Sequence, residues 1–109
     1  MPFGGGAEVT LQCAHRVLAL EVQIGLVEAG VGLIPAGGGC KEMVRRASDA
    51  ARTRGQNDPW EDIQRAFRNI IRGATSRGAI HAREMGYASP CDNVLLNANE
   101  VLYGAIQQA

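Results

Sequence analysis

The sequence predicts an α/β fold that is mostly helical and contains one or two strands. Apolar residues recur at helical spacing in five segments, and one further segment is apolar at every second position, which is typical of a strand. Glycine- and proline-containing turns separate these segments. Because a lone strand cannot satisfy its own backbone hydrogen bonds, we expect either a fragment of a larger fold or a chain completed by an oligomer.

The bulk composition is that of a globular protein of one domain at most. The chain has 109 residues, with 46% hydrophobic and 20% charged residues. Its 11 basic and 11 acidic residues cancel, so composition predicts no attraction to nucleic acid or to anionic membranes. No apolar run reaches the roughly 20 residues that span a bilayer, and no signal-peptide pattern opens the sequence, which favours a cytoplasmic location.

The three cysteines, Cys13, Cys40 and Cys91, are widely spaced and form no Cys/His cluster, so the sequence predicts neither a metal site nor a disulfide framework. One local charge bias stands out, because four arginines occur within ten residues: Arg45, Arg46, Arg52 and Arg54. We interpret them as a solvated helix end, and the alternative is contact with an anionic ligand tail.

The first predicted helix covers Ala7–Leu20. Val9, Cys13 and Val17 recur at i, i+4 and i+8 and would form its apolar stripe. The glycine triplet 4–6 precedes this helix and permits unusual backbone angles and a close approach to a ligand. The first turn of such a helix also points unpaired N–H groups outward.

The strand is predicted over Val22–Glu28. Val22, Ile24 and Leu26 share one side, and Glu28 continues the same parity at the end of the segment. A carboxyl group on that apolar side would be partly desolvated, which favours its protonated, proton-donating form. The apolar segment 31–34 then leads into a turn made of Pro-Ala-Gly-Gly-Gly.

Four further helices are predicted, over Lys41–Arg52, Pro59–Arg72, Ser76–Met85 and about 93–107. Asp58 is expected to cap the second of them and Ser76 the third. Their expected inward-facing residues are Met43, Val44 and Ala47, then Ile63, Ala66, Phe67, Ile70 and Ile71, and in the last helix Val94, Leu95, Ala98, Val101, Leu102, Ala105 and Ile106.

Three ordered motifs carry a resemblance to a known family. Gly-Gly-Gly-Ala-Glu at 4–8, Ile-Gly-Leu-Val-Glu at 24–28 and Gly-Leu-Ile-Pro-x-Gly-Gly-Gly at 32–39 resemble the enoyl-coenzyme A hydratase (crotonase) superfamily. The two glutamates are twenty positions apart, the separation of its hydratase members. The resemblance extends more loosely to 76–87, with an A-x-x-A-x-x-x-G helix. The variant is most similar to the hydratase region of multifunctional bacterial 3-hydroxyacyl-coenzyme A dehydrogenases, although no G-x-G-x-x-G follows a strand here.

This resemblance implies a fold and a set of site residues. The fold would be the C-terminal part of a crotonase-like ββα spiral, with 1–40 as the active-site segment and 41–109 as a helical region. Gly5 would donate its N–H to the thioester oxygen, Glu8 would hold and deprotonate water, and Glu28 would protonate the alpha carbon. The remaining implied substrate-binding residues are Gly4, Gly6, Val31, Gly32, Pro35 and Gly37.

The implied reaction is syn addition of water to a 2-trans-enoyl-coenzyme A in fatty-acid β-oxidation. Coenzyme A would enter as part of the substrate, with no covalently bound cofactor. The alternatives are double-bond isomerisation, which in this superfamily usually needs one of the two glutamates, and a non-catalytic helical piece that self-associates. The family's second oxyanion donor lies on an upstream segment absent here, and Ala14–Arg16 and Ala36 depart from its pattern. We therefore expect the isolated chain to be inactive and its partner to be further copies or the missing N-terminal half of the fold.

Overall fold

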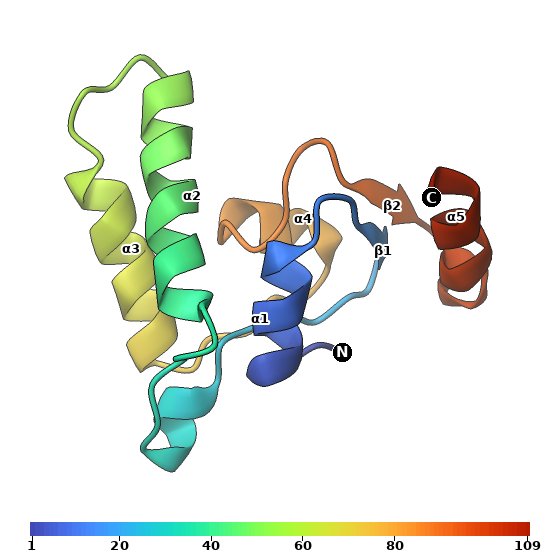
Figure 1. Ribbon diagram of the computed structural model, residues 1–109, viewed down its shortest axis with the longest axis horizontal. Coiled ribbons are helices and arrows are strands. Elements are labelled where there is room, and N and C mark those ends of the chain that lie inside the picture. Colours follow the sequence, from blue (N-terminus) through green and yellow to red (C-terminus); the bar gives the residue numbers. More distant parts are fainter.

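The computed structural model describes all 109 residues and contains five α-helices and two short strands, which confirms the predicted fold class. Helices α2 and α3 lie side by side as an antiparallel pair at one edge of the molecule, α1 and α4 lie in the middle, and α5 lies at the opposite edge (Figure 1). The elements are α1 (Gly5–Gln12), β1 (Val17–Ala19), the 3₁₀ helix η1 (Glu28–Val31), α2 (Gly39–Thr53), α3 (Trp60–Ile71), α4 (Ala79–Glu84), β2 (Asn93–Leu95), the 3₁₀ helix η2 (Ala98–Glu100) and α5 (Val101–Gln108).

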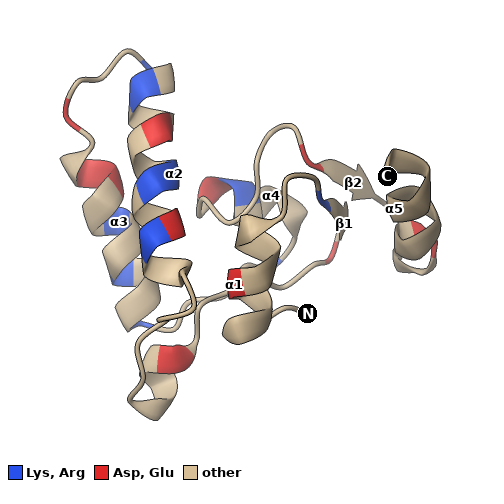
Figure 2. Cartoon of the chain, viewed as in Figure 1, with Lys and Arg blue, Asp and Glu red and all other residues tan.

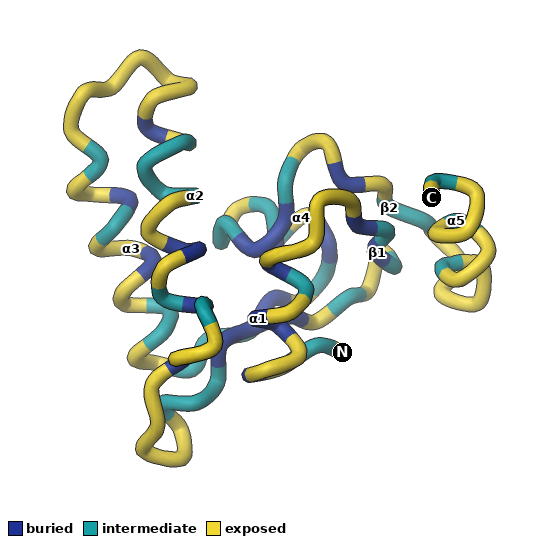
Figure 3. Tube along the Cα trace, viewed as in Figure 1, coloured by how far each residue is buried: buried dark blue, intermediate teal, exposed yellow.

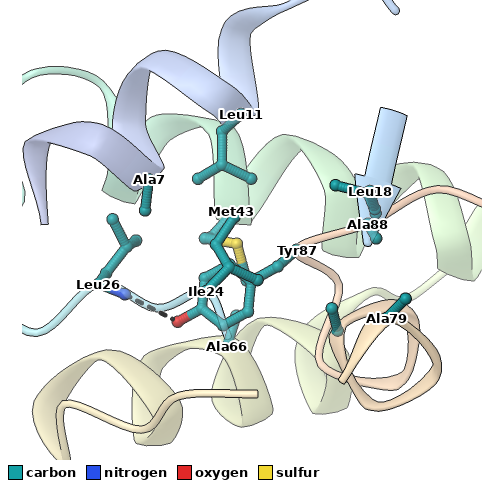
Figure 4. Packing of buried hydrophobic residues seen from close by; sticks show 11 residues of the cluster. Ala7, Leu11, Leu18, Ile24, Leu26, Met43, Ala66, Ala79, Tyr87 and Ala88 are labelled. Atoms are coloured by element: carbon teal, nitrogen blue, oxygen red, sulfur yellow. Dashed lines mark hydrogen bonds between the residues drawn. The ribbon is translucent and has the colours of Figure 1, made fainter. Parts of the chain in front are cut away.

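The core is one cluster of 11 buried hydrophobic residues, drawn from α1, the 24–26 segment, α2, α3 and α4 (Figure 4). Tyr87 is the largest fully buried side chain, and its hydroxyl oxygen accepts a hydrogen bond from the Leu26 N–H at 3.3 Å. Burial collects around α1 and α4, whereas α5 and the loop between α2 and α3 are exposed (Figure 3). The segment 24–26 is therefore held at the centre of the molecule.

The strand predicted over 22–28 is wrong, because no neighbouring strand runs beside this segment and Glu28 already belongs to η1. A single parallel bridge joins Gly25 to Phe3. The Ser76 hydroxyl accepts from the Ile24 N–H and donates to the Val22 carbonyl, both at 3.0 Å. Ser76 thus satisfies the backbone of this segment. The prediction that Ser76 caps a helix is therefore wrong. The inward alternation is confirmed, since Ile24 and Leu26 are both buried.

The predicted helix over Ala7–Leu20 is wrong beyond Gln12, where α1 ends. Residues 17–19 instead form β1, which pairs in parallel with β2, with Leu18 opposite Val94. The predicted stripe is also wrong, because Val9 and Cys13 are exposed while Ala7, Glu8 and Leu11 face inward. Pairing with a strand far along the sequence has overridden the local helical spacing.

A buried ion pair fixes this sheet. The Arg16 guanidinium, just before β1, contacts the Asp92 carboxylate, just before β2, through Nε–Oδ1 at 3.0 Å and Nη2–Oδ2 at 2.9 Å. Arg16 also donates to the Tyr87 carbonyl oxygen at 3.3 Å. The two strands are therefore joined by a bidentate pair at their N-terminal ends as well as by their backbone.

The last predicted helix is wrong over 93–97, because Val94 and Leu95 belong to β2 and α5 begins only at Val101. Several residues expected to face inward are exposed by more than 40%: Val44, Phe67, Ile71, Leu102 and Ile106. Helix α3 begins at Trp60, one residue later than predicted, and the Asp58 carboxylate accepts the Trp60 N–H at 3.0 Å. None of the helices combines the length and the apolar character that a bilayer crossing demands.

Asp92→Asn tests the buried ion pair. Removing this charge leaves the Arg16 guanidinium uncompensated in the interior, so we expect a loss of about 3 kcal/mol or more in the free energy of unfolding. Asp49→Asn is the matched control, because Asp49 pairs with Arg45 at the surface and should contribute about 1 kcal/mol or less. Urea denaturation measures both, and equal losses would contradict the structural role of Asp92.

Tyr87→Phe tests the buried hydroxyl through pH. Burial raises the pKa of Tyr87, with a further increase from Glu28 nearby, so the folded state resists losing this proton. Above about pH 10 the unfolded state releases the proton while the folded state retains it, and stability falls as pH rises. We expect Tyr87→Phe to flatten this fall in urea denaturation. The exposed Tyr103 offers a control, since Tyr103→Phe should leave the slope unchanged; a steep slope in Tyr87→Phe would contradict the assignment.

Candidate active site

The Glu8 carboxylate, on α1, lies at the N-terminus of α2. Glu8 is 8% exposed, and its Oε1 accepts the Gly39 N–H at 2.9 Å. Gly39 is the first residue of α2, which has 15 residues. An N-terminal helix amide is otherwise unpaired and lies at the positive end of the helix dipole. The Glu8 carboxylate therefore satisfies the first amide of α2.

The turn that precedes α2 approaches Glu8 so closely that side chains are excluded from it. A Cβ on Gly37 would overlap Glu8 Oε2, and a Cβ on Gly39 would lie 3.0 Å from Glu8 Oε1. Gln12, one helical turn after Glu8, donates from Nε2 to the Gly37 carbonyl at 3.0 Å and to the Glu8 carbonyl at 3.2 Å. The second glycine triplet thus makes room for a carboxylate, and Gln12 ties α1 to the turn.

Glu28 has the opposite surroundings. It begins η1 rather than ending a strand, and both of its carboxylate oxygens are buried with no hydrogen-bond partner. A Cβ on Gly4 would lie 3.3 Å from Glu28 Oε1, so this carboxylate faces the first glycine triplet. Buried polar groups without partners are rare in folded proteins, and each calls for an explanation such as a bound ligand or a catalytic role.

Cys40, the second residue of α2, lies within the electrostatic influence of both glutamates. Burial raises the pKa of the Cys40 thiol, and the nearby carboxylates of Glu8 and Glu28 raise it further. Both acids therefore act on one point at the start of α2 although they come from α1 and η1. Cys40 is a partly buried free thiol. No group of three or more His, Cys, Asp or Glu side chains is arranged to hold a metal.

The first glycine triplet starts α1 and leaves one amide available. The Gly4 N–H donates to the Gly25 carbonyl and the Gly6 N–H to the Phe3 carbonyl, both at 3.0 Å. Gly5 lies between them, is exposed, and its N–H has no backbone acceptor. Gly4 adopts φ 54°, a left-handed conformation that suits glycine. An unpaired amide of this kind can bind an oxygen atom that carries negative charge.

The other residues predicted to bind substrate are placed less uniformly. Pro35 is buried beside Gly39, whereas Gly6 is exposed on the first turn of α1. Val31 and Gly32 lie on the exposed turn that ends η1. A surface hollow of about 800 Å³ beside α2 is lined by neither Glu8 nor Glu28. Gly4 therefore adjoins Glu28 and Gly37 adjoins Glu8, whereas Val31 and Gly32 lie on an exposed turn.

Sequence reasoning missed three residues that hold this site: Gln12, Cys40 and Tyr87. Gln12 follows Glu8 by four positions, so helical spacing alone could have placed it on the same face of α1. Tyr87 supports the Leu26 backbone two residues before Glu28 from a loop 61 residues away, and no local pattern signals that contact.

Known proteins similar to this chain share one family. No family model matches the chain. A probable 3-hydroxyacyl-CoA dehydrogenase of Bacillus subtilis is 38% identical over 109 residues, which cover 100% of this chain and 13% of that protein. The fatty acid oxidation complex subunit alpha of Colwellia psychrerythraea is 39% identical over 81 residues, covering 73% of this chain and 10% of that protein.

The fold gives the same result. The crystal structure of an enoyl-CoA hydratase from Bacillus anthracis superposes with a TM-score of 0.69 and 25% sequence identity, over 97% of this chain and 34% of that one. The chain thus spans about a third of this solved structure and a smaller share of the curated relatives. The ordered glycine and glutamate motifs, the superposition and the sequence identity agree, and the chain belongs to the crotonase (enoyl-CoA hydratase) superfamily, of whose fold it corresponds to a part.

Proposed function

We propose that the chain carries the two-carboxylate part of an enoyl-CoA hydratase site, which adds water in syn fashion to a 2-trans-enoyl-CoA. The observation that carries this proposal is the contrast between the two acids around the start of α2. Glu8 accepts a helix N-terminal N–H, whereas the buried Glu28 oxygens have no donor. Two carboxyl groups whose environments differ can divide the work of a base and an acid.

Glu8 is the proposed base. Its Oε1 is occupied by the Gly39 N–H, and its Oε2 adjoins Gly37, which has no side chain. A water molecule hydrogen-bonded to Oε2 would give its proton to Glu8 while its oxygen forms the new bond to C3 of the enoyl thioester. The positive end of the α2 dipole keeps Glu8 ready to accept that proton.

Glu28 is the proposed acid. Both of its oxygens are buried and have no hydrogen-bond partner within the protein, so they remain available to the substrate for delivery of the proton needed at C2. As oxygen adds to C3, the electrons of the double bond move toward the thioester oxygen, and C2 takes the Glu28 proton. The balance is one water added, with its hydroxyl on C3, one proton delivered to C2 and one proton received by Glu8.

Gly5 is the proposed oxyanion donor. Its exposed N–H, at the start of α1, is free to donate to the thioester oxygen as negative charge develops there. One such donor typically contributes about 3–4 kcal/mol to transition-state stabilisation. The substrate brings its own coenzyme A, and the step consists of proton transfers and one C–O bond.

The relatives favour a place for this step in fatty-acid oxidation. The product of hydration, a 3-hydroxyacyl-CoA, is the substrate class in the name of the Bacillus subtilis relative. The exposed apolar residues of α3 and α5, including Phe67, Leu102 and Ile106, support completion of the site by other parts of the same fold, from this or another subunit.

Glu8→Gln and Glu28→Gln test the two roles. We would insert the chain in place of the matching segment of the Bacillus anthracis hydratase and follow the absorbance of crotonyl-CoA. Each change removes one proton-transfer group, so kcat should fall by about 10²–10⁴-fold with KM nearly constant. Glu21→Gln, at an exposed glutamate, is the matched control and should retain the parent rate.

The same variants separate hydration from the alternatives. An isomerase would be nearly indifferent to one of the two changes, and a non-catalytic piece would abolish the host's activity regardless of either glutamate. For the isolated chain, a thermal shift with crotonyl-CoA asks whether it binds the thioester, since a ligand that binds the folded state raises the melting temperature. If Glu8→Gln and Glu28→Gln both retained a kcat within about threefold of the parent value, the hydratase proposal would be refuted.

Gly37→Ala tests the space beside Glu8. The added methyl would overlap Oε2 and displace the carboxylate or the turn, and a shift of about 1 Å in a reacting group can lower the rate about 10²-fold. Gly30→Ala is the matched control, because a Cβ there meets nothing within 4 Å and the backbone angle is ordinary. Crotonyl-CoA hydration by the same chimaera measures both, and equal rates would show that this contact is irrelevant to catalysis.

A further inference from the structure

A hollow of the surface lies beside α2, and none of the residues proposed to carry out hydration, Gly5, Glu8 and Glu28, lines it. It has a volume of about 800 Å³ and is formed by the end of α1, one side of α2 and the 83–90 segment. Basic and acidic residues follow one another along α2 (Figure 2). Five arginines line the groove: Arg16, Arg45, Arg46, Arg54 and Arg83.

Only part of this positive charge is neutralised. Two acids line the groove, Glu42 and Asp49, and both bind Arg45, whose hydrogen bonds lower the pKa of Glu42. Arg16 and Arg54 pair with acids outside the groove. Three of the five arginines therefore have hydrogen-bonded carboxylate partners.

Arg46 has only a long ion pair with Glu42, and Arg83 has no carboxylate partner. The Glu42 oxygen nearest to Arg46 is 4.0 Å from its Nε, too far for a hydrogen bond. Arg83 donates to backbone carbonyls alone, with Nε to the Ser89 oxygen at 3.1 Å and Nη2 to the Asp92 oxygen at 2.7 Å. Two positive charges thus share the groove without a carboxylate hydrogen-bonded to either of them.

Of these two arginines, Arg46 gives the stronger evidence for a bound anion. Its side chain is 14% exposed, its Nη2 donates to the Leu11 carbonyl at 2.9 Å, and its Nε is buried with no partner. Burial lowers the pKa of Arg46, and the positive charges of Arg16 and Arg45 lower it further. A buried guanidinium donor beside like charges is unfavourable unless an anion completes it.

We propose that this groove is a second ligand site, which takes a small anion bearing a phosphate or diphosphate group, with Arg46 and Arg83 as its principal donors. Guanidinium groups match phosphate oxygens in a bidentate geometry, and the volume of the groove is within the range of small-molecule sites. The four-arginine cluster of the sequence fits this reading at Arg45, Arg46 and Arg54, whereas Arg52 lies at the surface beside Asp49.

Titration of the chain with inorganic pyrophosphate, followed by NMR at the arginine Nε–H signals, tests the site. We expect a saturable shift of the Arg46 signal and weaker binding, by about tenfold or more, in Arg83→Gln. Arg72→Gln is the matched control, because Arg72 is an exposed arginine outside the groove and its loss should leave binding unchanged. Circular dichroism checks that each variant is folded. If Arg83→Gln does not fold, the shift of the Arg46 signal in the unaltered chain decides whether the site exists.

Further arms separate the sources of the phosphate and the two proposals. Coenzyme A in place of pyrophosphate shows whether the substrate's own diphosphate can occupy the groove, and a saturable Arg46 shift with either compound supports the site. Glu8→Gln should leave this binding unchanged, so the hydratase proposal and the groove proposal can fail separately. The proposal is overturned if Arg46 shows no saturable shift with either compound, or if Arg72→Gln weakens binding as much as Arg83→Gln.

Discussion

The contact between the Glu8 carboxylate and the Gly39 N–H is the interaction on which the rest of the site depends. It places a buried acid of α1 against the first amide of α2, and it exists because neither Gly37 nor Gly39 has a side chain. Without that amide, Glu8 would be an unpaired buried charge, which is strongly unfavourable. One hydrogen bond therefore joins α1, the glycine turn and α2, and it fixes the direction in which the carboxylate presents its second oxygen.

The two acids of the site are chemically identical, and only their surroundings distinguish them. Glu8 receives a helix amide, while Glu28 is enclosed without any donor. The backbone before Glu28 is held by groups from distant parts of the chain, the Ser76 hydroxyl and the Tyr87 hydroxyl. The extended segment thus lacks a strand partner and is still held in one place, which is why Glu28 can face Gly4 without hydrogen bonds of its own.

The sequence predicted the local parts of this site and missed the distant ones. The glycine triplets, the glutamate spacing and the inward alternation of Ile24 and Leu26 can be recognised from neighbouring residues, and the structure places Glu8 beside Gly37 and Glu28 beside Gly4. The helix predicted through Val17 failed because β1 pairs with β2, whose residues follow 76 positions later in the sequence. The Arg16–Asp92 pair that accompanies this sheet joins equally distant residues, so no periodicity within a window of a few turns could have revealed it.

The spatial distribution of charge is the other property that the sequence alone could not predict. The 11 basic and 11 acidic residues cancel over the chain, yet five arginines and two acids line one groove. Helix α2 connects that groove to the carboxylates: its first amide serves Glu8, Met43 is buried in the core, and Arg45 and Arg46 line the groove. Balanced composition excludes a bulk electrostatic field, but a rigid helix with charged residues on one side can still concentrate positive charge where a small anion would fit.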